Sequence, residues 1–269
     1  SYRWLEFRRV LFRSVWLLNS IIKYYEQQDE NSRLEEDRAH YLEYLTTIKY
    51  LDKVCLKKAK ILDACAGTGS YCFYLAEKGH SVTAGDIAPS NVSIVEEKQK
   101  KNPVLHEIYT GDILDMSQFE DESFDVVMCL GAFYHLHNEI ERKKAVLECK
   151  RVVKRDGLII VAYLNRFASF INNFSNQSDN IHEIFNQFYT GNKSVFYRST
   201  PAEIEKLMSE CQIAKKYNIG TDGVAFMYPK QLQSITEAEF NEYLCYHYST
   251  CENENILGYS LHGLFIGEK

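Results

Sequence analysis

The stretch Ile61–Pro89, ILDACAGTGSYCFYLAEKGHSVTAGDIAP, decides the expected fold. Its short apolar start gives way to the small residues of 63–69, which predict a glycine-containing turn. The helix expected next ends at Gly79, where glycine adopts a left-handed cap at little cost. A second strand, 81–85, then leads to Asp86. The order strand, glycine turn, helix, strand and acid is typical of a nucleotide-type site in an open parallel sheet.

Predicted strands and helices alternate downstream of this stretch. Further strands are expected at 104–110, 124–130 and 158–164, with helices beginning near Pro89 and Asn138. The strand at 124–130 is continuously apolar, as expected for a central strand that is covered on both faces. Such alternation predicts parallel pairing with right-handed crossovers. We therefore expect an α/β fold with a doubly wound, mostly parallel sheet.

The flanking segments are predicted to be largely helical. A capping box at Ser32 and Glu35 predicts a helix that runs to about Cys55. One face of that helix is expected to carry Leu34, Tyr41, Leu45, Ile48 and Leu51. Residues 165–199 are too aromatic for a disordered linker and predict an inserted helical cap. Beyond them we expect a helix from Thr200, a strand at 212–219, a helix at 237–248 and a seventh strand at 259–266.

We interpret residues 15–269 as one domain. Its expected parts are an N-terminal helical lid at about 19–55, the core at 56–164, the cap at about 165–199, and C-terminal helices and strands at 200–269. The first fourteen residues, SYRWLEFRRVLFRS, are rich in arginine and carry no acid but Glu6. We interpret 1–14 as a non-native or peripheral segment and expect its deletion to leave activity intact.

The composition is ordinary for a soluble globular protein, with 45% hydrophobic and 25% charged residues in 269. A net charge of −6 argues against a nucleic-acid partner, which usually meets a basic face. No apolar run approaches the roughly 18 residues of a membrane span. The eight cysteines form no C-x-x-C pair and no metal-ligand spacing with histidine. We therefore expect reduced thiols in a cytoplasmic protein, and no metal site.

Five motifs between residues 55 and 165 resemble those of class I S-adenosylmethionine (SAM)-dependent methyltransferases. They are ILDACAGTG (61–69), the acid in VTAGDIAP (82–89), GDI (111–113), FDVVMCLGAFYHL (124–136) and RVVKRDGLIIVAY (151–163). The two ends, residues 24–45 and 261–269, resemble bacterial small-molecule-type members. The resemblance implies a Rossmann-like methyltransferase fold with a seven-stranded sheet. It also implies in-line transfer of the SAM methyl group to N, O or C of a small molecule, leaving S-adenosylhomocysteine (SAH), by a monomer or homodimer.

The same resemblance assigns cofactor contacts. Asp63, Ala64, Gly67 and Gly69 would line the methionine part of SAM, and Leu130 and Gly131 would lie by its sulfonium. Asp86 would accept hydrogen bonds from the ribose hydroxyls, with Ile87 against the adenine ring. Asp112 would accept from the adenine amino group, with Ile113 beside it. Cys65 replaces the first glycine of the family loop and becomes a ligand contact if its backbone is right-handed. Tyr24, Tyr25 and Arg33 are candidates to close over the bound ligand.

No nucleophile or metal is required, because the sulfonium already makes the methyl group electrophilic. A general base helps only where the acceptor is protonated, and His135 is the best candidate because free imidazole titrates near neutrality. The alternative to a catalytic role is a structural one, in which His135 packs in the interior or caps a helix. Tyr134 is expected to be a pocket wall rather than an acid.

Other classes stay open at this point. A nicotinamide dehydrogenase shares the layout, but the loop lacks G-x-G-x-x-G spacing. A base-amine methyltransferase usually has an [Asn/Asp]-Pro-Pro-aromatic turn where this chain has Gly131-Ala-Phe-Tyr. A methyltransferase acting on tRNA or a quinone ring, and a catalytically silent SAM-binding interaction protein, are further alternatives. The aromatic residues of 165–199 and 237–248 are expected to build the acceptor pocket or the core.

Overall fold

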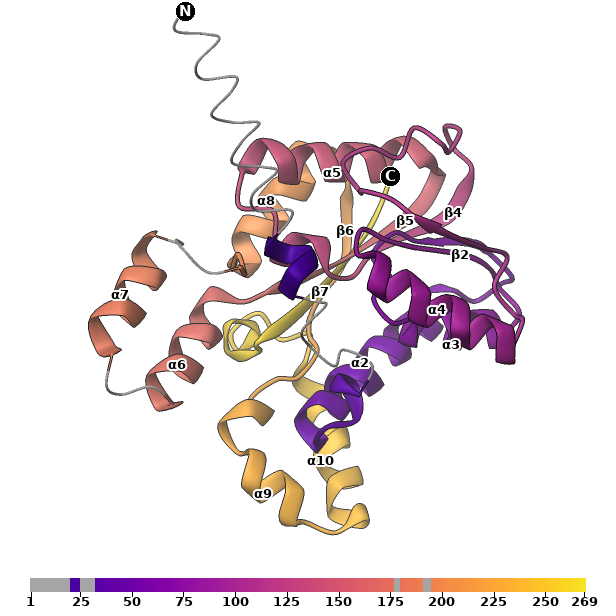
Figure 1. Cartoon of the computed structure of the whole chain (residues 1–269). Coiled ribbons are helices and arrows are strands. Elements are labelled where there is room, and N and C mark those ends of the chain that lie inside the picture. Colours follow the sequence, from indigo (N-terminus) through magenta and orange to yellow (C-terminus); the bar gives the residue numbers. More distant parts are fainter. Residues whose placement is uncertain (1–19, 25–31, 177–179, 191–194) are drawn as a thin grey trace, which may run out of the picture.

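The computed structural model describes residues 20–24, 32–176, 180–190 and 195–269. Tyr25 and the segment 1–14 lie outside these ranges. Within them the strands form one sheet in the order β3-β2-β1-β4-β5-β7-β6, which crosses the molecule in Figure 1. The strands are β1 (Lys60–Asp63), β2 (Ser81–Asp86), β3 (Glu107–Thr110), β4 (Phe124–Cys129), β5 (Val153–Leu164), β6 (Ala214–Gly220) and β7 (His262–Glu268).

Strands β1 to β5 pair in parallel, and β7 runs antiparallel to both β5 and β6. The predicted doubly wound, mostly parallel seven-stranded sheet is therefore confirmed. One boundary differs: β5 begins at Val153 instead of the expected residue 158, so residues 153–157 also belong to the strand. The pairing register with β4 shifts there, and Asp156 has a φ of 60°.

Helices cover both faces of the sheet. They are α2 (Arg38–Val54), α3 (Ser70–Glu77), α4 (Pro89–Lys101), α5 (Glu139–Val152), α6 (Arg166–Asn176), α7 (Ile181–Thr190), α8 (Pro201–Glu210), α9 (Pro229–Ser234) and α10 (Glu237–Thr250). Val127 and Cys129 of β4 pack with α5 and α8, whereas Val126 and Met128 pack with α2, α3 and α4. The central strand is thus buried on both faces, as its apolar run predicts.

The first long helix begins later than its sequence predicts. Asp37 is the N-cap of α2, because its Oδ1 accepts from the backbone N–H groups of Ala39 and His40 at 2.8 and 2.9 Å. Ser32 instead precedes a 3-10 turn, η1 (Arg33–Glu35). The buried face is also different, comprising Leu42, Glu43, Thr46, Thr47, Tyr50 and Leu51. Half of this face is polar, so hydrophobic periodicity could not identify it.

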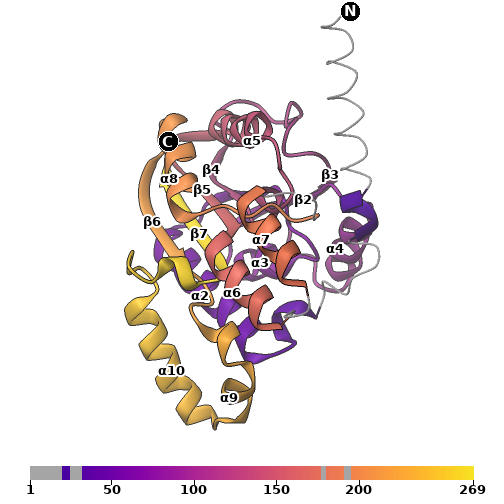
Figure 2. The same cartoon turned by 90° about the vertical axis from the view of Figure 1, so that its left-hand side faces the viewer.

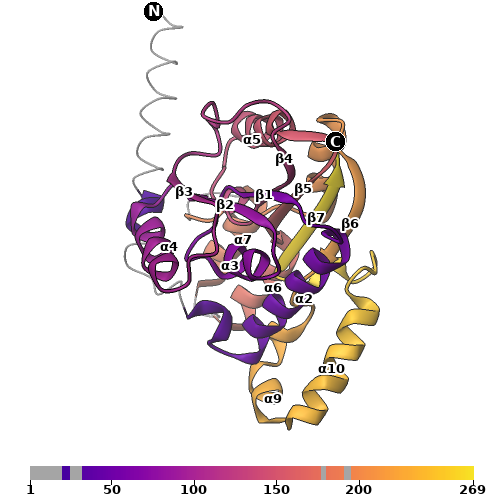
Figure 3. The ribbon, with the colours of Figure 1, turned by 90° about the vertical axis from the view of Figure 1, so that its right-hand side faces the viewer.

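Helices α6 and α7 occupy the segment at 165–199 and stand at the left of Figure 1. They pack through Phe170, whose ring lies 5.4 Å from Phe185 and 5.1 Å from Phe188 between centroids. Helices α9 and α10 lie below the sheet in both Figure 2 and Figure 3. No helix in the described part of the chain has the length and apolar character needed to cross a membrane.

Candidate functional site

A cavity of about 870 Å³ opens at the carboxyl edge of the parallel strands. The segments after β1, β2, β3 and β4 form one part of its wall, at 64–71, 86–91, 112–115 and 130–136. The chain leaves β1 toward β2 on one side, while β4 lies on the other side. This is the switch point of the sheet, where open α/β folds bind their ligands.

The loop after β1 is shaped by two left-handed glycines, Gly67 (φ 54°) and Gly69 (φ 98°). A Cβ added at Gly67 would meet nothing within 4 Å, so the loop is open at this position. Cys65 does not belong to the described residues with positive φ, and it lines the cavity. A side chain at this position therefore causes no left-handed strain, and it faces any ligand in the cavity.

Asp86 ends β2 and joins that strand to the loop. Its Oδ2 accepts from the Gly67 N–H at 2.9 Å, and its Oδ1 accepts from the Ala88 N–H at 2.8 Å and from Asn91 Nδ2 at 3.2 Å. Burial nevertheless outweighs these donors and raises the pKa of this carboxyl. A carboxylate held in this way is oriented before any ligand arrives.

Most residues predicted to contact a cofactor are brought together at this cavity. The lining contains Ala64, Cys65, Gly67, Asp86, Ile87, Asp112, Ile113, Leu130 and Gly131, together with Arg33, Tyr24, Tyr134 and His135. Asp112 is positioned by its own turn, since its Oδ1 accepts from the Leu114 N–H at 2.9 Å. The contacts of these side chains with a cofactor stay predictions.

Two predicted residues do not line the cavity. Asp63 is 1% exposed beneath the loop, and its Oδ1 has no hydrogen-bond partner within the described part of the chain. Burial and the nearby charge of Asp86 raise its pKa to about 7. Gly69 caps α3, and a Cβ there would lie 2.9 Å from the ring of Phe73. Asp63 is thus buried at the end of β1, and Gly69 stands where the loop ends and α3 begins.

His135 and Tyr134 follow β4 in the turn η2 (Ala132–Tyr134) and at its end. Nδ1 of His135 lies 3.0 Å from the carbonyl oxygen of Val195, and its ring lies 5.2 Å from that of Phe196. Burial lowers the pKa of His135 to about 4, so the ring is neutral at pH 7 and weakly basic. The catalytic role of this histidine stays a prediction.

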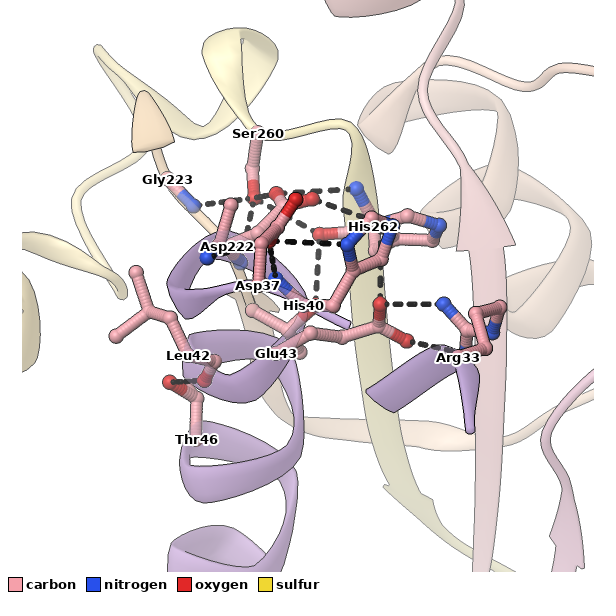
Figure 4. Close-up of polar contacts among 12 residues, drawn as sticks. Arg33, Asp37, His40, Leu42, Glu43, Thr46, Asp222, Gly223, Ser260 and His262 are labelled. Atoms are coloured by element: carbon pink, nitrogen blue, oxygen red, sulfur yellow. Dashed lines mark hydrogen bonds and ion pairs between the residues drawn. The ribbon is translucent and has the colours of Figure 1, made fainter. Parts of the chain in front are cut away.

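Sequence reasoning missed a buried polar cluster at the wall where β7 begins (Figure 4). Arg33 binds Glu43 through two hydrogen bonds of 2.9 and 3.1 Å. Nδ1 of His262 lies 2.7 Å from Asp222 Oδ2 and 3.5 Å from Glu43 Oε2. Ser260 donates to the other oxygen of Asp222. We call Arg33, Glu43, Asp222, Ser260 and His262 the buried polar cluster.

Opposing effects set the ionisation of this cluster. Burial opposes the charge of Glu43, but the Arg33 guanidinium outweighs it and lowers the pKa of Glu43 to about 2. Burial likewise opposes protonation of His262, but Glu43 and Asp222 together raise its pKa. No local pattern could reveal the cluster, because Asp222 follows the end of β6 and lies 40 residues before His262 in the sequence.

Known proteins match both the core sequence and the fold. Residues 62–161 match the family model "Methyltransferase domain". A glycine/sarcosine N-methyltransferase of Aphanothece halophytica is 33% identical over 108 residues, covering 39% of this chain and 40% of that protein. A ubiquinone biosynthesis O-methyltransferase of Xanthomonas campestris pv. campestris is 27% identical over 114 residues, covering 42% and 46%. The chain thus spans less than half the length of these relatives.

Two solved structures share the fold over most of the chain. A SAM-dependent methyltransferase from Thermotoga maritima has a TM-score of 0.60 at 15% identity, covering 93% of this chain and 99% of that one. One from Methanosarcina mazei has a TM-score of 0.57 at 17% identity, covering 81% and 96%.

The cavity fits the cofactor of this family. The open position above Gly67 leaves room for a ligand against the loop. Acids at the ends of β2 and β3 are hydrogen-bond acceptors suited to a nucleoside. This chain carries the methyltransferase domain and the fold of the class I SAM-dependent methyltransferases, whose cofactor is SAM.

Proposed function

We propose that this protein transfers the methyl group of SAM to a nitrogen, oxygen or carbon nucleophile of a small molecule. The observation that carries the proposal is one cavity with two differently built walls. One wall is the glycine loop with Asp86 and Asp112. The other is built from α6, the segment 196–198 and the start of β7.

Each wall has a separate task in this proposal. The loop at 65–68 would hold the methionine part of SAM, Asp86 the ribose and Asp112 the adenine. SAM supplies an electrophilic methyl carbon, so the chain has to orient the acceptor and exclude water. Ser169, Asn172 and Asn173 of α6 offer neutral polar groups for an acceptor, and Phe196 offers an apolar face.

The size of the cavity supports a small acceptor. About 870 Å³ is near the upper end of the range of roughly 300–1,000 Å³ for small-molecule sites. Such a volume accommodates a nucleoside cofactor with a compact acceptor beside it. Two of the relatives have names that indicate small-molecule acceptors: the glycine/sarcosine N-methyltransferase and the ubiquinone biosynthesis O-methyltransferase.

A quinone-type aromatic ring is the second candidate acceptor. It is supported by the ubiquinone-biosynthesis relative and by the aromatic side chains of Tyr24, Tyr134 and Phe196 in the cavity wall. Aromatic rings pack against one another in offset or edge-on geometry, which would orient a flat acceptor.

We also propose a cytoplasmic location, since all eight cysteines, each within the described residues, are free thiols.

The test has two stages. Calorimetry should detect SAM binding, with NAD as the control ligand; heat from NAD with none from SAM would exclude the proposal. Purified protein with isotope-labelled SAM is then added to a cell extract separated into small-molecule, lipid and RNA fractions. Mass spectrometry should find the label in a small molecule or a quinone. Label in RNA alone, or bound SAM with no labelled product in any fraction, would contradict it.

A further inference from the structure

His262 lies where the antiparallel strand β7 enters the sheet at its functional edge. It pairs in register with Leu164, the last residue of β5, and both line the cavity. Its ring centroid is 6.3 Å from that of Tyr134, which follows β4. His262 therefore belongs to the wall away from the glycine loop, where the acceptor would sit in the proposed function.

One ring nitrogen of His262 is fully engaged. Nδ1 lies 2.7 Å from Asp222 Oδ2, and Asp222 is itself held by Ser260 and by the backbone N–H of His262 at 3.2 Å (Figure 4). Asp222 is 4% exposed, so its carboxylate is shielded from water. This arrangement selects the tautomer with hydrogen on Nδ1 and fixes the plane of the ring.

The second ring nitrogen is accessible. Nε2 of His262 has no hydrogen-bond partner among residues 20–24, 32–176, 180–190 and 195–269. It is not among the side-chain atoms in those ranges that are fully buried without a partner, so it keeps accessible surface. Since the ring lines the cavity, Nε2 is open to a molecule inside it. A histidine with one nitrogen on a carboxylate and the other on a reactant has the geometry of a general base.

We propose that His262, oriented by Asp222, takes the proton from the nucleophile of the acceptor. The acceptor class follows: a hydroxyl or an amine whose attacking atom carries hydrogen. This inference rests on the proposed function. The bond from hydrogen to the nucleophile breaks and the proton passes to Nε2. The nucleophile forms a bond to the methyl carbon, and the electron pair of the old carbon–sulfur bond stays on sulfur in SAH.

The charges around His262 suit a proton acceptor. The ionised groups that face it are Glu43, Asp222 and Arg33, with the phenol of Tyr134 nearby. With a neutral His262 the two carboxylates and one guanidinium leave one net negative charge in a buried place. A proton on His262 cancels that charge. The same carboxylates raise the pKa of His262, whereas burial makes His135 a much weaker base.

The first test needs no acceptor. Full-length protein labelled with ¹³C at histidine Cε1 is titrated by NMR in the presence of SAH, and His262→Asn assigns the resonance. His262 should titrate above the ordinary imidazole pKa of about 6.5, and Asp222→Asn should lower that value. The control His106→Asn removes an exposed histidine and should leave the titration unchanged. A ring that stays charged, or stays neutral, across the whole pH range in which the protein is folded would overturn the proposal.

The second test uses the acceptor found in the cell extract. His262→Asn should lower kcat about 100-fold below the pKa of that acceptor, while the Kd for SAM stays unchanged. The deficit should shrink as the pH approaches the acceptor's own pKa, because an ionised nucleophile needs no base. A deficit that is the same at every pH would show a structural role. Wild-type protein that binds SAM and methylates nothing would instead contradict the proposed function, and the NMR titration still decides the ionisation of His262.

Discussion

The backbone N–H of Gly67 donates a 2.9 Å hydrogen bond to Oδ2 of Asp86, which ties the loop after β1 to the end of β2. Gly67 holds a φ of 54°, a conformation that costs glycine little. Asp86 is 8% exposed, so the bond is formed out of bulk water. One acid thus organises the glycine loop and, in the proposed function, also binds the ribose.

Replacing Asp86 should therefore weaken SAM binding. Asp86→Asn keeps the shape of the side chain, but its amide group cannot accept at both positions used by Gly67 and Ala88. We expect a loss of about 1.5–3 kcal/mol, or roughly ten- to hundredfold in Kd, measured by calorimetry. Asp121→Asn, at an exposed carboxylate that pairs with Arg151, is the matched control. An unchanged Kd in folded Asp86→Asn would show that this acid does not contact the cofactor.

Asp63 should make stability depend on pH. Its folded pKa of about 7 lies above the unfolded value of 3.8, so the folded protein binds the extra proton between these values. The free energy of unfolding that this group contributes is therefore highest at acid pH and falls as pH rises from about 4 to about 7. Asp63→Asn should be more stable relative to the wild type at pH 8 than at pH 5, measured by urea unfolding. An equal difference at the two pH values would mean that Asp63 ionises normally.

The contribution of Glu43 to the free energy of unfolding should depend on pH in the opposite direction. Its folded pKa of about 2 lies below the unfolded value of 4.5, so its contribution is present above pH 4.5 and is lost as pH falls toward 2. Glu43→Gln leaves the half-buried Arg33 without its carboxylate and should cost up to about 3 kcal/mol at pH 7. Urea unfolding at pH 7 and pH 3 measures both effects. The double variant Arg33→Met/Glu43→Leu should recover part of the loss, and no recovery would argue against an ion-pair cause.

His135 should prove structural rather than basic. Nδ1 donates to the carbonyl of Val195, which helps to hold the segment 195–198 over the turn after β4. His135→Asn should cost about 1 kcal/mol of stability and reduce turnover less than His262→Asn does. Its pH–rate profile should keep the wild-type form, because a group with a pKa of about 4 is neutral throughout the working range. If the pH–rate profile of His135→Asn lost its fall in rate at acid pH, His135 would be the general base instead.

The sheet and the loop were predictable because both depend on local features. Alternating strand and helix patterns imply parallel crossovers, and the left-handed turns at Gly67 and Gly69 require glycine. The predicted boundary of α2 failed because Asp37 caps it and half of its buried face is polar. Asp63 is buried and does not line the cavity, which a motif alone could not show; its contact with the cofactor stays a prediction.

By itself the sequence determined the parallel core of β1 to β5 and the position of the loop, since hydrophobic periodicity and glycine conformations act within a few residues. Only the tertiary structure decided the opposite wall. Glu43, Asp222 and His262 come from a helix, a turn and a strand far apart in the chain, and none has a local pattern that distinguishes it. They meet because buried charges must find partners, and that requirement is met only when the whole chain has folded.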